Sequence, residues 1–448
     1  MRILILLPLI FFFSAANIFS QIDILGKIKD KVEKKVDEKT DEGIDKGIEE
    51  IEKGIEEGVE ENQEDPEKKN DQEKTESNQE DPEKKNNQEK TGSNQEDQLK
   101  IYSKFEFVPG DKIVFYDDYT EEEVGTFPTR WNTNSTGEIV TLSKYPGKWL
   151  KLKNGASYLP EIQAPFPEDF TVEFDIIFLD PSGNGGRVGD IILHTLAIPE
   201  GERDFINHPY GYNPSESNAT LLVTTTIQAS EIASILYENS LNGESYGINS
   251  SATFKLFEGK LGKPVHFAIT QNKLRYRMWV DEKKVLDLPR FVPPAVFNTF
   301  MIGLWGWYAD DDLNQCFLSN FKFTTAMADV RKTFEKTKKF VTTGVLFDVN
   351  SDIIKPQSYG TLKQIADLMK DNKDKFKVVG YTDSDGDDKS NLTLSKKRAD
   401  AVIQSLISEF GIDVSRLVSE GKGESDPVGD NKTPQGKASN RRVEIIKL

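Results

Sequence analysis

The chain has 448 residues, of which 29% are charged, and its formal net charge is −18. Such an acidic chain, with no basic patch, lacks the charge that neutralises phosphates, so nucleic acid is excluded as a partner. The single cysteine, Cys316, excludes an intramolecular disulfide framework, and with only three histidines we expect no His- or Cys-based metal site and no cofactor.

Residues 1–21 have the pattern of a secretory signal peptide. Arg2 precedes an apolar run from Ile3 to Phe13, and the small residues 14–16 follow it. The run is about half of the ~20 residues that a membrane-spanning helix needs. No cysteine follows the expected cleavage site, so the sequence predicts an exported protein without a lipid anchor.

Residues 22–100 are too polar to bury a core, since more than half of them are charged. In residues 22–61, apolar residues recur every three or four positions, which predicts an amphipathic acidic helix interrupted by glycines. Self-association through residues 25–59 is one interpretation, and a fraying or membrane-surface helix is the other. A 16-residue repeat, NQEDPEKKNDQEKTES, then fills residues 62–100 and predicts a disordered linker.

Residues 101–326 contain short alternating runs of aromatic and β-branched residues, separated by turn residues. FTVEFDIIFL (170–179) is one such run, and residues 265–270, 273–280 and 284–288 follow at hairpin spacing. The pattern predicts an all-β sandwich or barrel. The phrases KPVHFAITQNKLRYRMWVDEKKVLDL (263–288) and FLSNFKFT (317–324) resemble the concanavalin A-like (laminin G-like) jelly roll.

That resemblance implies a glycan or protein ligand, with calcium sometimes held at loop edges. Asp310, Asp311 and Asp312 are the calcium candidates, although an ordinary exposed turn has the same composition. Trp305 and Trp307 alternate onto one face, where they would either stack on sugar rings or pack in the core. No carboxylate pair here has the context of a glycosidase.

After a linker at 327–339, residues 340–448 alternate strand and helix patterns. We expect strands at 341–347, 376–381, 416–420 and 442–447, with helices at 359–369 and 391–410. The predicted order is β-α-β-α-β-β, which makes this an α+β domain.

The segments FDVNSDIIKPQS (347–358), GYTDSDGDDKSNLTLSKKRADAV (380–402) and GKASNRRVEI (436–445) resemble the OmpA-like peptidoglycan-binding domain. Ten positions of the second segment fit the family pattern GHTD-x2-G-x4-N-x2-LS-x2-RA-x2-V in register, and Tyr381 replaces the usual histidine. The resemblance covers about 110 residues, and it implies a domain of the Gram-negative periplasm or outer membrane.

Asp383 and Arg398 have the chemistry to bind a zwitterion. A carboxylate at the end of a strand and an arginine in the next helix can converge, so that one binds an ammonium and the other a carboxylate. The free end of meso-diaminopimelate in a peptidoglycan stem peptide is such a group, and the resemblance implies these roles. The alternative is a structural salt bridge between Asp383 and Arg398.

Further contacts follow from the same resemblance. Asp348 and Asn350 would face the peptide from the 347–351 loop, and Leu394 would pack beneath it. Asn391 would either stabilise the loop or contact the ligand, and Arg441 would reach the stem peptide. The domain contains no general base, nucleophile or metal set, so we expect binding without catalysis.

The sequence thus favours an exported cell-envelope protein that binds peptidoglycan noncovalently and tethers a β-sandwich to the wall. One alternative is a carbohydrate-active or glycan-binding protein whose sandwich acts on a polysaccharide. Another is an integral outer-membrane β-barrel in residues 101–326 with a periplasmic anchor, because lipid-facing strands also alternate.

Overall fold

The structure is a computed structural model that describes residues 105–179, 187–199, 219–228, 232–247, 249–305, 315–325, 330–371 and 373–448. These residues belong to one compact unit of the chain, 97–448. The predicted signal peptide (1–21), acidic helix (22–61) and repeat linker (62–100) lie outside them. Within the described ranges, no helix has both the length and the apolar character needed to cross a membrane.

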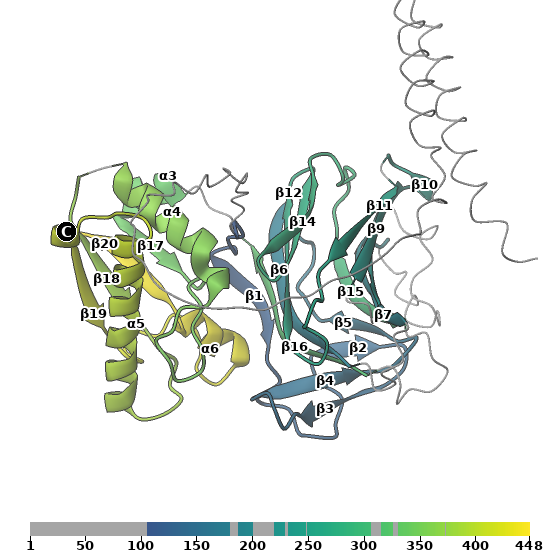
Figure 1. The fold of residues 1–448 in the computed structure, drawn as a ribbon, viewed down its shortest axis with the longest axis horizontal. Coiled ribbons are helices and arrows are strands. Elements are labelled where there is room, and N and C mark those ends of the chain that lie inside the picture. The colour runs from purple at the N-terminus through teal and green to yellow at the C-terminus, as the bar shows by residue number, and fades with distance from the viewer. Residues whose placement is uncertain are drawn as a thin grey trace, which may run out of the picture. The chain divides into compact units, whose positions relative to one another are not determined.

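The first part of the unit, which we call the sandwich (residues 105–325), consists of two antiparallel sheets stacked on one another (Figure 1). One sheet contains β1 (Lys112–Asp117), β3 (Gly137–Thr141), β4 (Lys148–Leu152), β6 (Asp169–Phe178), β12 (Val265–Asn272), β13 (Arg275–Val280), β14 (Lys283–Leu288) and β16 (Cys316–Thr325). The other contains β2 (Trp131–Thr133), β5 (Ser157–Pro160), β7 (Arg187–Ala197), β8 (Ala219–Gln228), β9 (Ile232–Leu241), β10 (Glu244–Ser245), β11 (Ser250–Lys255) and β15 (Thr299–Trp305). The sheet-rich middle region is therefore confirmed, whereas its assignment to the concanavalin A-like family stays a prediction.

The core of the sandwich lies between the two sheets. Alternate residues of β6, such as Val172 and Phe174, meet Leu193 of β7 and Ile302 of β15 in one buried cluster. Side chains that alternate along a strand bury one face of the sheet against its partner. The strands form two open sheets around this core, so the alternative of a single closed sheet is wrong for these residues.

Part of the outer face of the first sheet is also buried, which simple alternation does not predict. Glu173 of β6 is 4% exposed and forms an ion pair of 2.7 Å with Lys322 of β16. Asp175 lies 2.7 Å from Nδ1 of His266 on β12 and accepts a 2.7 Å hydrogen bond from Asn320. Glu173 and Lys322 are buried, and Asp175 and His266 are partly buried. Each of these charged groups has a partner on a neighbouring strand, which lowers the cost of removing it from water.

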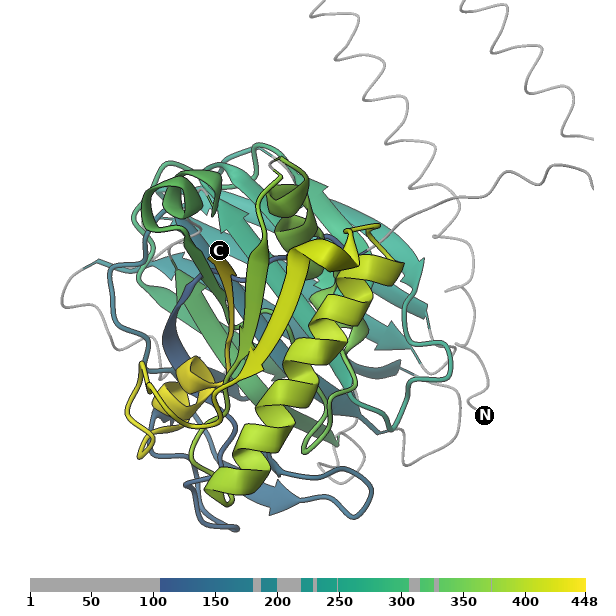
Figure 2. The same ribbon diagram turned by 90° about the vertical axis from the view of Figure 1, so that its left-hand side faces the viewer.

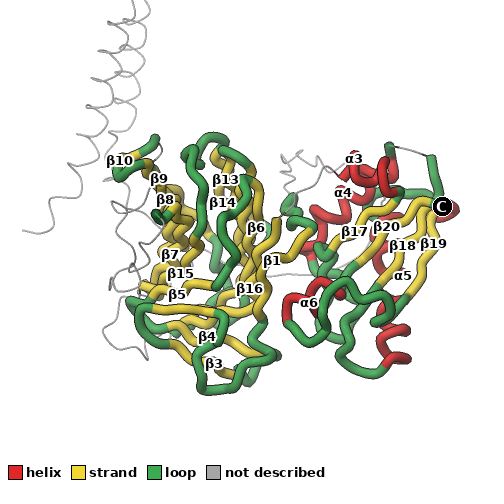
Figure 3. The backbone as a smooth tube through the Cα atoms, turned by 180° about the vertical axis from the view of Figure 1, so that it is seen from behind, coloured by secondary structure: helices red, strands yellow, loops and turns green. Residues whose placement is uncertain are grey.

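The second part of the unit, the C-terminal domain (residues 330–448), has a four-stranded sheet in the order β17-β20-β18-β19. Its strands are β17 (Lys339–Thr342), β18 (Phe376–Gly380), β19 (Leu417–Gly421) and β20 (Val443–Lys447). Its helices are α3 (Val330–Thr337), α4 (Tyr359–Lys370), α5 (Asp388–Ser408) and α6 (Pro434–Asn440), with 3-10 turns η4 (Pro356–Ser358) and η5 (Val414–Arg416). Figure 2 shows α5 as the long helix beside the strands, and Figure 3 shows the described helices confined to this domain.

Three details of the C-terminal domain differ from the sequence prediction. The strand expected at 341–347 is β17 (Lys339–Thr342), which ends before the residues that lead to the 347–351 loop. The polar segment PQGKASN forms α6, so the order is β-α-β-α-β-α-β after α3 rather than β-α-β-α-β-β. Residues 330–337 form α3 inside the stretch expected to be a linker, 327–339. Val330 and Phe334, one helical turn apart, are buried in the core of this domain, so α3 belongs to the domain and not to a linker.

Candidate functional site

The candidate site begins where β18 ends. Gly380 is the last residue of β18, and a Cβ atom placed there would lie 2.2 Å from the carbonyl oxygen of Ser395 in α5. The absence of a side chain at Gly380 therefore lets α5 approach the strand closely. This approach brings the loop that carries Asp383 next to the helix that carries Arg398.

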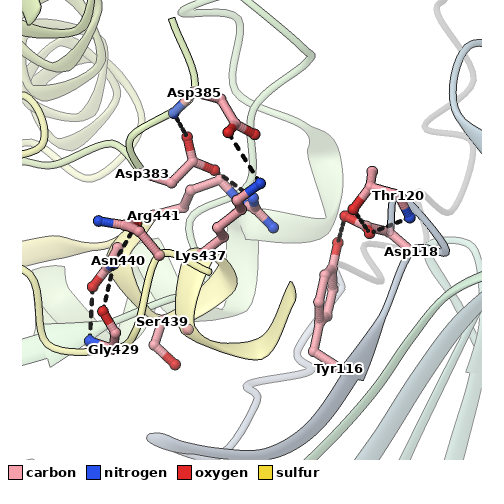
Figure 4. Close-up of polar contacts among 12 residues, drawn as sticks. Tyr116, Asp118, Thr120, Asp383, Asp385, Gly429, Lys437, Ser439, Asn440 and Arg441 are labelled. Atoms are coloured by element: carbon pink, nitrogen blue, oxygen red, sulfur yellow. Dashed lines mark hydrogen bonds and ion pairs between the residues drawn. The ribbon is translucent and has the colours of Figure 1, made fainter. Parts of the chain in front are cut away.

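Asp383 is 8% exposed and has two polar partners. Its Oδ2 accepts a hydrogen bond of 2.6 Å from Nη1 of Arg441, and its Oδ1 accepts one of 3.2 Å from the backbone N–H of Asp385 (Figure 4). An ionised carboxylate has about four acceptor positions, so two of them are left for a further donor. Arg441 follows the last residue of α6, which places its guanidinium at the loop.

Arg398 points from α5 to the loop at 347–351. Its Nε donates to the carbonyl of Ser351 at 3.0 Å, its Nη2 donates to the carbonyl of Asp348 at 3.4 Å, and its guanidinium carbon lies 4.9 Å from the centre of the Phe347 ring. In the described part of the chain, Nη1 and the second hydrogen of Nη2 have no partner. These two groups form the end-on edge of the guanidinium, which a carboxylate can bridge in bidentate fashion.

Asn391 holds the Asp383 loop in place. This buried side chain, in the first turn of α5, donates through Nδ2 to the carbonyl oxygens of Asp383 (3.3 Å) and Asp385 (3.1 Å). Nδ2 also lies 2.7 Å from the carboxylate of Glu424. The geometry brings Asp383, Asn391 and Arg441 into one network.

The other predicted contacts, Asp348, Asn350 and Leu394, lie on the 347–351 loop and on α5. Asp348 accepts the hydrogen bond from Arg398 through its backbone carbonyl. Its exposed side chain lies 3.7 Å from Nζ of Lys355 instead. Asn350 is exposed and has a φ of 54°, a left-handed conformation that asparagine tolerates better than most residues. Leu394 is half-buried and precedes Arg398 by one turn of α5.

Tyr381, at the position where the family usually has histidine, packs beside the site. The guanidinium carbon of Arg442 lies 3.6 Å from the centre of its ring, and its hydroxyl donates to Glu444 at 3.1 Å. Burial and the Glu444 carboxylate raise the pKa of Tyr381 to about 12. Tyrosine therefore fills this position as a neutral group.

The electrostatics of the site combine one anionic and two cationic groups. Burial lowers the pKa of Arg398, and the nearby carboxylate of Asp383 acts against that effect. The positive charge of Arg441 also reaches Arg398 and lowers its pKa further. An arrangement of two guanidiniums around one carboxylate suits a ligand that carries both an ammonium and a carboxylate.

The candidates in the sandwich cannot be placed in the same way. Asp310, Asp311, Asp312 and Trp307 lie outside the described residues, whereas Trp305 is the last residue of β15. Among the described residues, no group of three or more His, Cys, Asp or Glu side chains could hold a metal ion.

Comparison with known proteins finds a likeness in the C-terminal domain. Residues 346–441 match the model of the OmpA family. The chain is 46% identical over 101 residues to Outer membrane porin F of Pseudomonas fluorescens. The aligned residues make up 22% of this chain and 31% of that protein. It is also 37% identical over 92 residues to Peptidoglycan-binding protein ArfA of Mycobacterium bovis. Those residues make up 20% of this chain and 28% of that protein.

Among solved structures, the peptidoglycan-associated lipoprotein from Burkholderia pseudomallei has 30% sequence identity and a TM-score of 0.22, and it covers 23% of this chain and 88% of that chain. The similarity to Outer membrane porin F and to ArfA spans less than a third of the length of each of those two proteins.

Proposed function

We propose that the protein is a noncovalent peptidoglycan anchor of the cell envelope, because residues 346–441 match the model of the OmpA family. It resides at the periplasm or outer membrane, where the predicted signal peptide would direct it. One relative, Peptidoglycan-binding protein ArfA, is named for binding this ligand, which supports the proposal. Tethered in this way, the sandwich would be held at the cell wall.

The group that the site binds, in this proposal, is the free end of meso-diaminopimelate in the stem peptide. Asp383 accepts the ammonium through its unused acceptor positions, and the open edge of Arg398 binds the carboxylate as a bidentate fork. The observation that carries the proposal is the fixed orientation of Arg398. Its hydrogen bonds to the carbonyls of Ser351 and Asp348 hold that edge in one place before any ligand arrives.

The proposed protein binds and does not catalyse. Binding to a polymer by two charge-assisted contacts needs no activated nucleophile, and Asp383 is already engaged with Arg441 at 2.6 Å. The anchor holds the sandwich at the wall, and this role does not depend on a ligand of the sandwich.

The test is cosedimentation of the full-length protein with intact sacculi. We expect binding to sacculi that contain meso-diaminopimelate, and we expect free meso-diaminopimelate to compete. Sacculi with lysine at that position lack the second carboxylate and should bind more weakly by at least tenfold. Equal binding to both kinds of sacculi would contradict the diaminopimelate assignment, and binding to neither would contradict the anchor.

A matched variant controls for the loss of charge. Asp400 lies on α5, is exposed, and forms an ion pair of 2.6 Å with Lys396. The substitution Asp400→Asn makes the same chemical change as Asp383→Asn in a helix of the same domain. We expect Asp400→Asn to bind sacculi as the unmodified protein does.

A further inference from the structure

We propose that strand β1 of the sandwich completes the peptidoglycan site, with Tyr116 as a positioning residue that holds Arg441 against Asp383. This inference rests on the proposed function and adds to it a residue from outside the OmpA-family domain. Tyr116 precedes Asp383 by more than 260 positions in the sequence, and Figure 4 shows the two parts of the chain facing each other.

The sequence of β1 directs Tyr116 outward. The strand pairs antiparallel with β16, where Phe115 lies opposite Phe323 and Tyr116 lies opposite Lys322. Phe115 is buried in the core of the sandwich. Since neighbouring side chains of a strand point to opposite faces, Tyr116 stands on the outer face of the sheet.

Tyr116 contacts the guanidinium that pairs with Asp383. The guanidinium carbon of Arg441 lies 5.5 Å from the centre of the Tyr116 ring, within the range of a cation–π interaction. The same guanidinium donates to Asp383 at 2.6 Å. Arg441 is therefore held between a ring from the sandwich and a carboxylate from the C-terminal domain.

The orientation of the Tyr116 ring is itself fixed. Its hydroxyl donates to Asp118 at 3.3 Å, and Asp118 accepts hydrogen bonds from the backbone and the hydroxyl of Thr120. Burial raises the pKa of Tyr116, so the hydroxyl stays protonated and able to donate. The ring face is thereby presented to Arg441 in a defined position.

Side chains of α6 make further contacts with the sandwich, one of them to β1. Gln435 donates through Nε2 to the backbone carbonyl of Ile113 at 3.0 Å. Nζ of Lys437 lies 3.4 Å from Glu121 and 3.1 Å from Asp385, so it joins the sandwich to the loop of Asp383. The sandwich thus holds both the helix that precedes Arg441 and the loop that carries its carboxylate partner.

The consequence is a preorganised site. While Tyr116 keeps Arg441 bound to one oxygen of Asp383, the carboxylate has a fixed orientation. Its remaining acceptor positions then always face the same way. Without the ring, Arg441 is free to adopt other rotamers, and Asp383 loses its fixed partner. Ordering these groups again would then lower the affinity for the ligand.

The experiment compares full-length variants in cosedimentation with sacculi that contain meso-diaminopimelate. Tyr116→Leu fills a similar space but has no ring face, and we expect it to weaken binding by roughly 3- to 30-fold. Tyr116→Phe keeps the ring face and loses only the 3.3 Å hydrogen bond to Asp118, so its binding should stay within about twofold of that of the unmodified protein. Tyr237→Leu is the matched control, because Tyr237 is half-buried in β9 of the opposite sheet, and its binding should be unchanged.

A double substitution tests whether Tyr116 acts through Arg441. If it does, Tyr116→Leu should cause no further loss in a protein that already carries Arg441→Ala. Fully additive losses, unchanged binding of Tyr116→Leu, or tighter binding of Tyr116→Leu would each overturn the inference.

The outcome also separates this inference from the proposed function. If the unmodified protein binds, Asp383→Asn does not, and Tyr116→Leu binds normally, only the inference is overturned. If the unmodified protein does not bind these sacculi, the anchor proposal fails and the inference fails with it.

Discussion

Arg441 donates a hydrogen bond of 2.6 Å to Asp383, whereas Arg398 donates to the backbone carbonyls of Ser351 and Asp348. Asp383 is thus paired with a different arginine from the one that the salt-bridge alternative named. Arg398 keeps its end-on edge open on the same side of the domain. Asp383 and Arg398, which together we call the proposed clamp, are therefore positioned independently of each other, each by its own partners.

Replacing Asn391 by alanine should destabilise the site and the domain together. The change removes the Nδ2 hydrogen bonds to the carbonyls of Asp383 and Asp385 and leaves these two carbonyl oxygens without that donor. We expect a loss of about 1–3 kcal/mol in the free energy of unfolding of the domain. Denaturant titration of Asn391→Ala measures this, and a loss below about 0.5 kcal/mol would show that the loop does not depend on Asn391.

The close approach of α5 to β18 predicts the effect of Gly380→Ala. The new Cβ would lie 2.2 Å from the Ser395 carbonyl oxygen, a distance that no van der Waals contact permits. The helix must shift, and overpacking of this kind costs roughly 1–3 kcal/mol or more. The free energy of unfolding, measured by chemical denaturation, should fall. Sacculus binding should weaken as well, because the shift also displaces Arg398. Gly303→Ala is the control, because a Cβ atom there would lie 3.5 Å from its nearest neighbour, at an ordinary contact distance.

The partly buried cluster around His266 predicts a dependence of stability on pH. Burial alone would lower the pKa of His266, but the carboxylates of Asp175 and Glu173 outweigh it and raise the pKa to about 9. A group whose pKa is raised in the folded state stabilises fully below its unfolded value of about 6.5 and loses that contribution as the pH rises through its folded value. The melting temperature of the sandwich should therefore fall between about pH 6.5 and pH 9.

His266→Gln checks this assignment. The variant should melt at a lower temperature at pH 6, and its melting temperature should change much less than that of the unmodified protein between pH 6.5 and pH 9. Equal slopes for the two proteins over that range would show that another group titrates.

Arg398→Lys should abolish most sacculus binding although it keeps the charge. An ammonium cannot present the two parallel N–H groups that a carboxylate bridges, and it cannot reproduce the hydrogen bond from Nε to Ser351. We expect a loss of well over tenfold in affinity, measured by a binding isotherm on sacculi. Arg331→Lys, at an exposed ion pair of 2.9 Å with Asp371 on the same domain, is the control. Unchanged binding of Arg398→Lys would mean that the fork geometry is not used.

Much of the fold was predictable because it depends on local periodicity. The helix expected at 359–369 is α4, and the strand expected at 170–179 is β6, since alternation and 3.6-residue spacing are visible in a single segment. The segment PQGKASN has no apolar periodicity, so α6 escaped prediction. Its structure depends on the Thr433 side chain, which accepts a hydrogen bond from the backbone N–H of Gly436, and on contacts to β1.

The site was predictable only in its parts. A motif within one segment indicates Asp383 and Arg398, but the pairing of Asp383 with Arg441 joins residues 58 positions apart, so local spacing does not determine it. The contact between Tyr116 and Arg441 joins two domains, and nothing in the local sequence of β1 marks Tyr116 as part of a site. Such contacts depend on how elements pack, which local spacing does not encode.

The most direct measurement of the proposed clamp is melting temperature and sacculus binding on one sample of Asp383→Asn. Truncating one partner of a desolvated charge pair costs about 2–5 kcal/mol, so binding should weaken by well over tenfold. The melting temperature should change by only a few degrees, because the side chain of Arg441 is 34% exposed and can turn to water. A marked fall in melting temperature, together with sacculus binding that survives in the folded fraction, would contradict the role of Asp383 as the ammonium ligand.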